Sequence, residues 1–144
     1  MTTKSLTEAL QVFKNGGFVI VTDDEKRENE GDLLMLAEHA TTEKTAFMVR
    51  HTTGILCVAI TAESAYRLRL PYMVELNQDA RHTAFTVSVD LAHGITTGVS
   101  AQERTATIRA LGSPTSRDTD FIRPGHVFPL IAKDGGVLMR SGAA

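Results

Sequence analysis

The feature that most constrains the fold is an alternation of short apolar runs with segments of helical periodicity. The apolar runs with strand character are FVIVTD (18–23), LLMLAE (33–38), ILCVAIT (55–61), AFTVSVD (84–90), VFPLIA (127–132) and GGVLMR (135–140). Helical patterns lie between several of them, in SLTEALQVFKNGG (5–17), TTEKTAFMVRHTTG (41–54) and AESAYRLRL (62–70). Strands that alternate with helices predict an α/β domain with a largely buried sheet.

Local signals place two further segments. Ser100, followed three residues later by Glu103, is typical of a capping box and predicts a helix from about 101 to 111. The stretch SPTSRDTDFIRPGH (113–126) has the composition of a loop.

Composition excludes several classes of protein. A chain of 144 residues, 42% apolar and 22% charged, fits one globular domain. A net charge of −2 with scattered basic residues argues against nucleic acid or an anionic membrane as a partner. The single cysteine, Cys57, excludes an intramolecular disulfide and a thiolate zinc site, and its apolar surroundings predict a core residue. Since no apolar run has membrane-spanning length and no signal-peptide core is present, we expect a cytoplasmic protein.

An acidic run lies between the first two apolar runs, in VTDDEKRENEGDLLML (21–36). Six carboxylates fall within ten residues: Asp23, Asp24, Glu25, Glu28, Glu30 and Asp32. The run is either a solvated turn or a site for a hard cation, with Lys26 or Arg27 directed at an anionic substrate. A calcium loop is excluded, because Asn29 would stand where an EF-hand has glycine. A position after a predicted central strand favours a ligand site, and Gly31 would allow a sharp turn, but both interpretations stay open.

Two later segments carry residues of a kind used in active sites. GITTGVSAQER (94–104) offers backbone amides before a helix start, which suits either a phosphate cradle or an ordinary capped loop. RPGHVFPL (123–130) places His126 between a Pro-Gly turn and a strand. A histidine there can serve acid–base chemistry or bond to loop carbonyls. The other histidines have no partner at helical spacing, so no His-x-x-x-His metal face is expected.

Three stretches taken together, DDEKRENEGD, GITTGVSAQER and RPGHVFPL with GGVLMR, resemble the signature segments of the 3,4-dihydroxy-2-butanone 4-phosphate synthase family of riboflavin biosynthesis. They follow the family's order and roughly its spacing, so residues 1–144 are interpreted as a single, incomplete synthase domain. The resemblance implies a three-layer α/β fold with a mixed sheet and helices on both faces. It also implies a lyase that converts D-ribulose 5-phosphate to 3,4-dihydroxy-2-butanone 4-phosphate and formate, uses Mg²⁺ or Mn²⁺, and forms its active sites at a homodimer interface.

The same resemblance assigns roles to individual residues. Glu28 matches a metal-ligating and catalytic glutamate, and His126 matches a histidine essential for the chemistry. Asp32 matches a carboxylate that contacts the sugar hydroxyls and is also assigned to catalysis. Arg27, Arg140 and Gly142 match further substrate-binding positions. Thr97, near the helix start at Ser100, is added as a substrate contact. These types suit the reaction, because forming an enediol takes a base for the carbon proton and a Lewis acid on the adjacent oxygens.

The end of the chain departs from the family pattern. Where the family continues GGVL-x-R-x-G with His-Thr-Glu-Ala, this chain reads RSGAA, so Ala143 stands at the position of the second metal ligand. We expect the C-terminal strands and helix of the family to be missing, which would expose apolar surface such as VFPLIA. The alternative to an active lyase is a truncated or diverged member that binds sugar phosphate or is a structural remnant.

Overall fold

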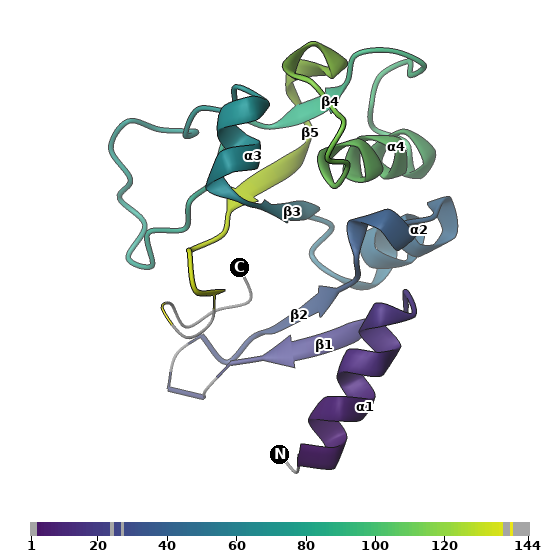
Figure 1. Ribbon diagram of the computed structural model, residues 1–144, viewed down its shortest axis with the longest axis vertical. Helices are drawn as coiled ribbons and strands as arrows, with labels where there is room; N and C mark the ends of the chain where they lie inside the picture. Colours follow the sequence, from purple (N-terminus) through teal and green to yellow (C-terminus); the bar gives the residue numbers. More distant parts are fainter. Residues whose placement is uncertain (1–2, 24, 27, 137–138, 140–144) are drawn as a thin grey trace.

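The computed structural model describes residues 3–23, 25–26, 28–136 and 139. In chain order the elements are α1 Thr3–Lys14, β1 Val19–Thr22, β2 Gly31–Leu34, α2 Thr42–His51, β3 Cys57–Ile60, α3 Ala62–Arg67, β4 Val89–Leu91, α4 Ala101–Leu111 and β5 Phe121–Ile131. Short 3-10 helices occupy Ala37–His39 and Asp118–Asp120. Figure 1 shows their arrangement.

A mixed three-stranded sheet forms the centre of the molecule, in the order β3-β5-β4. The middle strand, β5, runs parallel to β3 and antiparallel to β4. Helix α4 packs on these strands and on α2, and α3 and α4 lie to either side of β5 in Figure 1. The predicted α/β class with a mixed sheet and helices on both faces is confirmed.

The core lies where the central sheet meets the helices. Leu68, Val89 and Val127 are all 0% exposed, and Ile108 and Leu111 of α4 are nearly as buried. Ile108 and Leu111 share one face because they are three residues apart on a helix. Burying an aliphatic side chain of this kind contributes about 1.5–3 kcal/mol.

Threonine hydroxyls tie α4 to its neighbours inside this core. The Oγ1 atoms of Thr45 on α2 and Thr105 on α4 lie 2.6 Å apart. The Leu91 N–H on β4 donates to Thr107 Oγ1 at 3.0 Å. Both α4 threonines are buried, and their hydroxyls also donate back to α4 carbonyls. Their polar atoms are therefore satisfied, and α4 is fixed against the strand that carries part of the site below.

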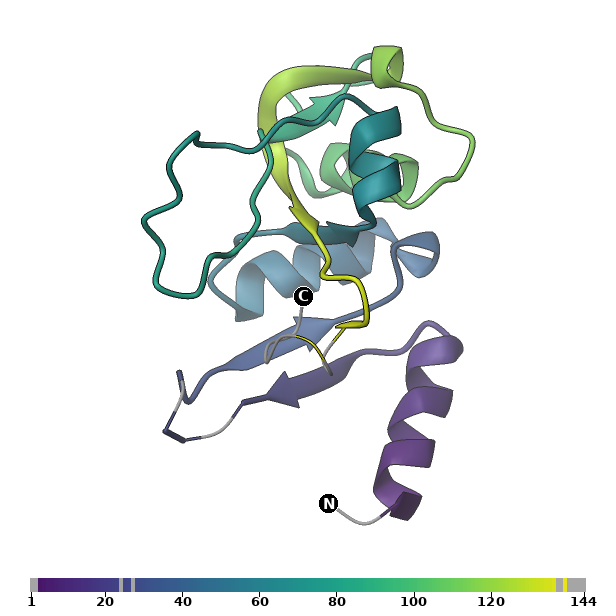
Figure 2. The same cartoon turned by 60° about the vertical axis from the view of Figure 1, so that its left-hand side comes forward.

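The hairpin β1–β2 is separate from the central sheet. Its strands are antiparallel, with Thr22 opposite Gly31. Figures 1 and 2 show it below the central sheet and beside α1. An apolar groove of about 630 Å³ is lined by side chains from α1, β1, β2 and β3. The prediction of a buried central strand is wrong for β1, because Ile20 is 68% exposed and Val21 41%.

Three further predictions need correction. Residues 121–126 belong to β5 and not to a loop. The run VFPLIA is largely buried as the second half of β5, with Val127 0% and Leu130 8% exposed, so the expectation that it is exposed is wrong. The exposed large apolar side chains lie elsewhere, on α1, on β1 and in the segment 72–76 between α3 and β4, among other places. Of the run AFTVSVD, only the last two residues join the named strand β4. Of the run GGVLMR, residues 137–138 and 140 lie outside the described ranges.

Candidate functional site

The acidic run forms the connection of the β1–β2 hairpin, and one of its own carboxylates organises it. Asp23 accepts the backbone N–H of Glu28 at 3.1 Å and that of Glu30 at 2.9 Å. Asn29 takes the left-handed conformation that closes the turn, with φ 52°. The expectation that Gly31 makes the sharp turn is wrong, because Gly31 is already extended and paired in β2. Asp23 therefore shapes the turn, while Glu28 and Glu30 project from it.

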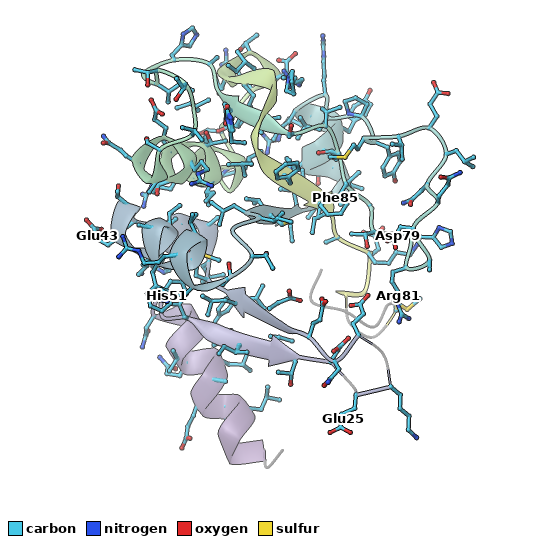
Figure 3. The ribbon with its side chains drawn as sticks, turned by 180° about the vertical axis from the view of Figure 1, so that it is seen from behind. Glu25, Glu43, His51, Asp79, Arg81 and Phe85 are labelled. Atoms are coloured by element: carbon cyan, nitrogen blue, oxygen red, sulfur yellow. The ribbon has the colours of Figure 1, made fainter. Side chains whose placement is uncertain are left out.

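A basic side chain from a distant segment meets this turn. Arg81 lies between α3 and β4, and its Nε is 3.3 Å from Oε1 of Glu28. Figure 3 labels Arg81 on the side of the molecule where Glu25 marks the acidic turn. Both partners are only partly exposed, at 43% for Arg81 and 36% for Glu28. The Glu28 carboxylate thus faces a position where a positive charge is stabilised.

The segment that carries Arg81 is itself held by a carboxylate. Asp79 accepts the backbone N–H groups of Arg81 at 3.2 Å and Thr83 at 2.8 Å. Hydrogen bonds from Thr83 and Arg81 lower the pKa of Asp79 to about 2. The carboxylate is therefore ionised at neutral pH, and it fixes the backbone from which Arg81 extends.

Asp32 lies on β2 beside Cys57 of β3. Burial raises the pKa of the Cys57 thiol, and the negative charge of Asp32 raises it further. The prediction that Cys57 is a core residue is wrong, because its side chain lines the apolar groove, whose walls desolvate the thiol while leaving the residue accessible to solvent. The burial alternates along β3, so Val58 fills the core and Cys57 faces the hairpin. The charge of Asp32 therefore acts on a thiol that stays protonated at neutral pH.

His126 is held by a buried carboxylate that sequence reasoning missed. Its ring Nδ1 lies 2.7 Å from Oδ2 of Asp90, and its backbone N–H donates to Oδ1 of the same residue at 2.9 Å. Asp90 is 2% exposed, whereas the His126 side chain is 46% exposed. Gly125 makes this approach possible, because a Cβ there would lie 2.0 Å from the Val89 carbonyl carbon. With Nδ1 donating to the carboxylate, Nε2 is left with a lone pair that can accept a proton.

The segment 94–100 covers Asp90 from the other side. Gly98 takes φ 81°, and a Cβ there would lie 2.1 Å from Asp90 Oδ2. Glu103 in the first turn of α4 accepts the Thr96 N–H and, at 2.8 Å, the Thr96 hydroxyl; it also accepts the Gly98 N–H at 3.1 Å. Hydrogen bonds from Thr96 and then Ser100 lower the pKa of Glu103 to about 2. Thr97 is exposed between these fixed residues.

This arrangement favours the capped loop over the phosphate cradle for this segment. A phosphate cradle would need free backbone amides at the start of α4. The amides of Thr96 and Gly98 already bond the carboxylate of Glu103, so the chain supplies its own anion there. The segment is a capped loop, in which Ser100 accepts the Glu103 N–H at 3.1 Å and α4 begins at Ala101 as predicted.

The predicted site residues fall into two groups. Glu28 and Asp32 lie on the hairpin, whereas His126 and Thr97 lie around Asp90 of β4. In Figures 1 and 2, β4 lies near the top of the molecule and the hairpin in its lower half. Arg27, Arg140 and Gly142 are outside the described residues. One copy of the chain, as far as the structure describes it, does not bring Glu28 and His126 together.

A divalent cation would find only part of a coordination shell here. Within the described ranges, no three His, Cys, Asp or Glu side chains are grouped as a metal site would require. The Glu28 carboxylate suits a hard cation, and Mg²⁺ is often held by one or two carboxylates together with water and substrate oxygens. Glu28 therefore fits a metal as one ligand among others.

Also within the described residues, no helix is long and apolar enough to cross a bilayer.

Sequence comparison gives one family. The sequence model described as 3,4-dihydroxy-2-butanone 4-phosphate synthase matches residues 7–144. The chain is 52% identical over 142 residues to the 3,4-dihydroxy-2-butanone 4-phosphate synthase of Helicobacter pylori and 54% identical over 138 residues to the riboflavin biosynthesis protein RibBA of Chlamydia muridarum. The alignments cover 99% and 96% of this chain but 41% and 32% of the two relatives. The chain thus spans less than half the length of these curated relatives.

Solved structures give the same result. The fold is similar to a crystal structure of 3,4-dihydroxy-2-butanone 4-phosphate synthase in complex with two magnesium ions, with a TM-score of 0.93 and 51% identity. That match covers 95% of this chain and 64% of the other. A cation-free form of such a synthase matches with a TM-score of 0.88 and 49% identity, covering 95% of this chain and 63% of that one.

Proposed function

The chain belongs to the 3,4-dihydroxy-2-butanone 4-phosphate synthase family, and we propose that it forms the acid–base and metal-binding part of a lyase of riboflavin biosynthesis. The substrate is D-ribulose 5-phosphate, and the products are 3,4-dihydroxy-2-butanone 4-phosphate and formate. Residues 1–144 form part of one synthase domain. The cytoplasmic location expected from the sequence stays a prediction.

The observation that carries this proposal is the His126–Asp90 pair. Enediol formation from a ketose phosphate begins with removal of a proton from a carbon next to the carbonyl. His126 Nε2 accepts that proton, since Nδ1 already donates to Asp90 at 2.7 Å. The Asp90 carboxylate is buried against the ring, so it stabilises the imidazolium that forms and keeps the ring in the required tautomer.

The acidic turn supplies the metal end of the site. Glu28 would hold Mg²⁺ or Mn²⁺ together with water and substrate oxygens. A divalent cation there supplies Lewis-acid polarisation of the ketose oxygens. Asp32 accepts hydrogen bonds from the sugar hydroxyls, and Arg27, Thr97, Arg140 and Gly142 contribute further contacts to the substrate.

A complete site requires a second copy of the chain. Glu28 and His126 belong to separate parts of one copy, so the acidic turn of one copy and the His126 region of its partner together enclose one substrate. A closed two-fold arrangement would form two such sites at once. The separation of the hairpin from β4 supports this arrangement.

The test is formate release from ribulose 5-phosphate by the purified chain with Mg²⁺, with and without EDTA. We expect metal-dependent formate that His126→Ala and Glu28→Gln each abolish. Glu25→Gln is the matched control, because it removes an exposed carboxylate from the same turn without touching the proposed ligand. Metal-dependent binding of the sugar phosphate without formate from folded protein would instead favour the non-catalytic sugar-phosphate binder.

A further inference from the structure

The geometry points to Glu103 as a positioning residue for His126. We propose that Glu103 holds Gly98 against Asp90, and that Asp90, covered in this way, fixes the His126 imidazole. The inference rests on the proposed function only in that His126 is taken as the acid–base group. The contacts on which the inference rests all lie within one copy of the chain.

The first step is the attachment of the loop to α4. Both oxygens of Glu103 are used: Oε1 accepts the N–H and hydroxyl of Thr96, and Oε2 accepts the N–H of Gly98. The carboxylate carries a full negative charge at neutral pH, and hydrogen bonds to a charged acceptor are about twice as strong as neutral ones. Residues 96–98 are therefore fixed relative to the first turn of α4.

The second step is the contact of the loop with Asp90. Gly98 packs so closely on Asp90 that a Cβ would lie 2.1 Å from Oδ2. That oxygen is also the one that lies 2.7 Å from His126 Nδ1. The Gly98 backbone thus covers the atom on which the orientation of the histidine depends. Exclusion of water from this oxygen strengthens its bond to the ring, because a lower local dielectric strengthens a hydrogen bond.

The N-cap bond of α4 does not use the Glu103 carboxylate. Ser100 already caps α4 through the backbone N–H of Glu103, and that bond survives any change of the Glu103 side chain. Loss of the carboxylate therefore leaves the cap in place and releases the loop. An effect of Glu103 on the stability of α4 can therefore be distinguished from its effect on the position of His126.

The test is nuclear magnetic resonance of the full chain carrying Glu103→Gln, which needs no turnover. A glutamine cannot accept from both the Thr96 and Gly98 amides, because one of its two ends is a donor. We expect the Gly98 amide to exchange with solvent about tenfold faster. We also expect the His126 Nδ1–H signal to shift and to broaden through faster exchange. If the chain releases formate, kcat should fall while KM stays close to its original value.

Two further variants complete the experiment. Glu43→Gln is the matched control, because it also removes a carboxylate from the first turn of a helix, here α2, but one that does not hold residues 96–98. It should leave the His126 signal unchanged. Gly98→Ala places a methyl group against Asp90 with Glu103 intact and should disturb the His126 signal directly. An unchanged His126 signal in Glu103→Gln would overturn the proposal, whether or not the loop amides exchange faster. Absence of formate from the unaltered chain would count against the proposed function and not against this coupling.

Discussion

Arg81 reaches from the segment before β4 to Glu28 on the acidic turn, with 3.3 Å between Nε and Oε1. This ion pair shows that the Glu28 carboxylate stabilises a neighbouring positive charge. Arg81 would also compete with a metal ion for the same Glu28 oxygen. The acidic run is therefore neither fully solvated nor held by its own residues alone. Its charge is balanced in part from a segment about fifty residues further along the chain.

Removing Arg81 should tighten binding of a divalent cation. An ion pair exposed to this degree contributes at most about 1 kcal/mol, so Arg81→Gln should lower the Kd for Mn²⁺ by up to about fivefold. Isothermal titration of the two proteins with Mn²⁺ measures the difference. Arg69→Gln, which breaks a surface pair with Asp118 on another part of the molecule, serves as control. Weaker Mn²⁺ binding in Arg81→Gln would mean that Arg81 supports the site and does not compete for it.

Asp90→Asn should abolish most of the proposed activity while preserving the fold. The asparagine oxygen can still accept the His126 backbone N–H, but its amide would face Nδ1 as a donor. The ring would then carry its proton on Nε2 and could not act as a base. By analogy with the buried aspartate of serine proteases, the formate rate should fall by a factor on the order of 10³ to 10⁴. Asp118→Asn is the control, and a loss below tenfold would contradict the assigned role of Asp90.

Asp32→Asn should make the Cys57 thiol more acidic. The Asp32 charge is one of two causes that raise the pKa of this thiol, and the larger one, burial, remains in the variant. More thiolate at neutral pH means faster alkylation, so the pH profile of iodoacetamide reaction should move to lower pH. Asp134→Asn tests whether any loss of negative charge has the same effect. Superimposable profiles for Asp32→Asn and the original chain would show that the two side chains are not coupled.

Acid should weaken the segment that carries Arg81. The pKa of Asp79 is lowered from 3.8 to about 2, so the folded state holds this carboxylate ionised where the unfolded chain would already be protonated. The stability it contributes is fully present above pH 3.8 and is lost as the pH falls to about 2. The urea midpoints of the original chain and Asp79→Asn should therefore differ at pH 6 and converge toward pH 2. A constant difference across this range would contradict the assignment.

Local signals in the sequence were sufficient where the structure is local. The spacing of Ser100 and Glu103 predicts α4 with its observed limits, because a capping interaction involves only neighbouring residues. The prediction for β1 was wrong because an apolar run indicates burial only if something covers it, and Ile20 has no such cover among the described residues. The general class of the fold followed from the alternation of strands and helices.

Residues of the candidate site could be predicted only where they stand within a recognisable sequence motif. His126 stands in a recognisable segment, but its partner Asp90 lies 36 positions away and meets it only through the pairing of β4 with β5. A carboxylate that ends an alternating strand was the one available signal for Asp90. Arg81 and the carboxylate of Glu103 gave no such signal, because each acts through a contact made by tertiary folding.

The most direct test of a site shared between two copies is formate release by a mixture of Glu28→Gln and His126→Ala chains, each inactive alone. If each substrate lies between the acidic turn of one copy and His126 of the other, a mixed pair contains one intact site. Equal mixing with free exchange should then restore about a quarter of the original rate, since half of the pairs are mixed and each has one of its two sites intact. No recovery, although mixed pairs form, would contradict the shared site.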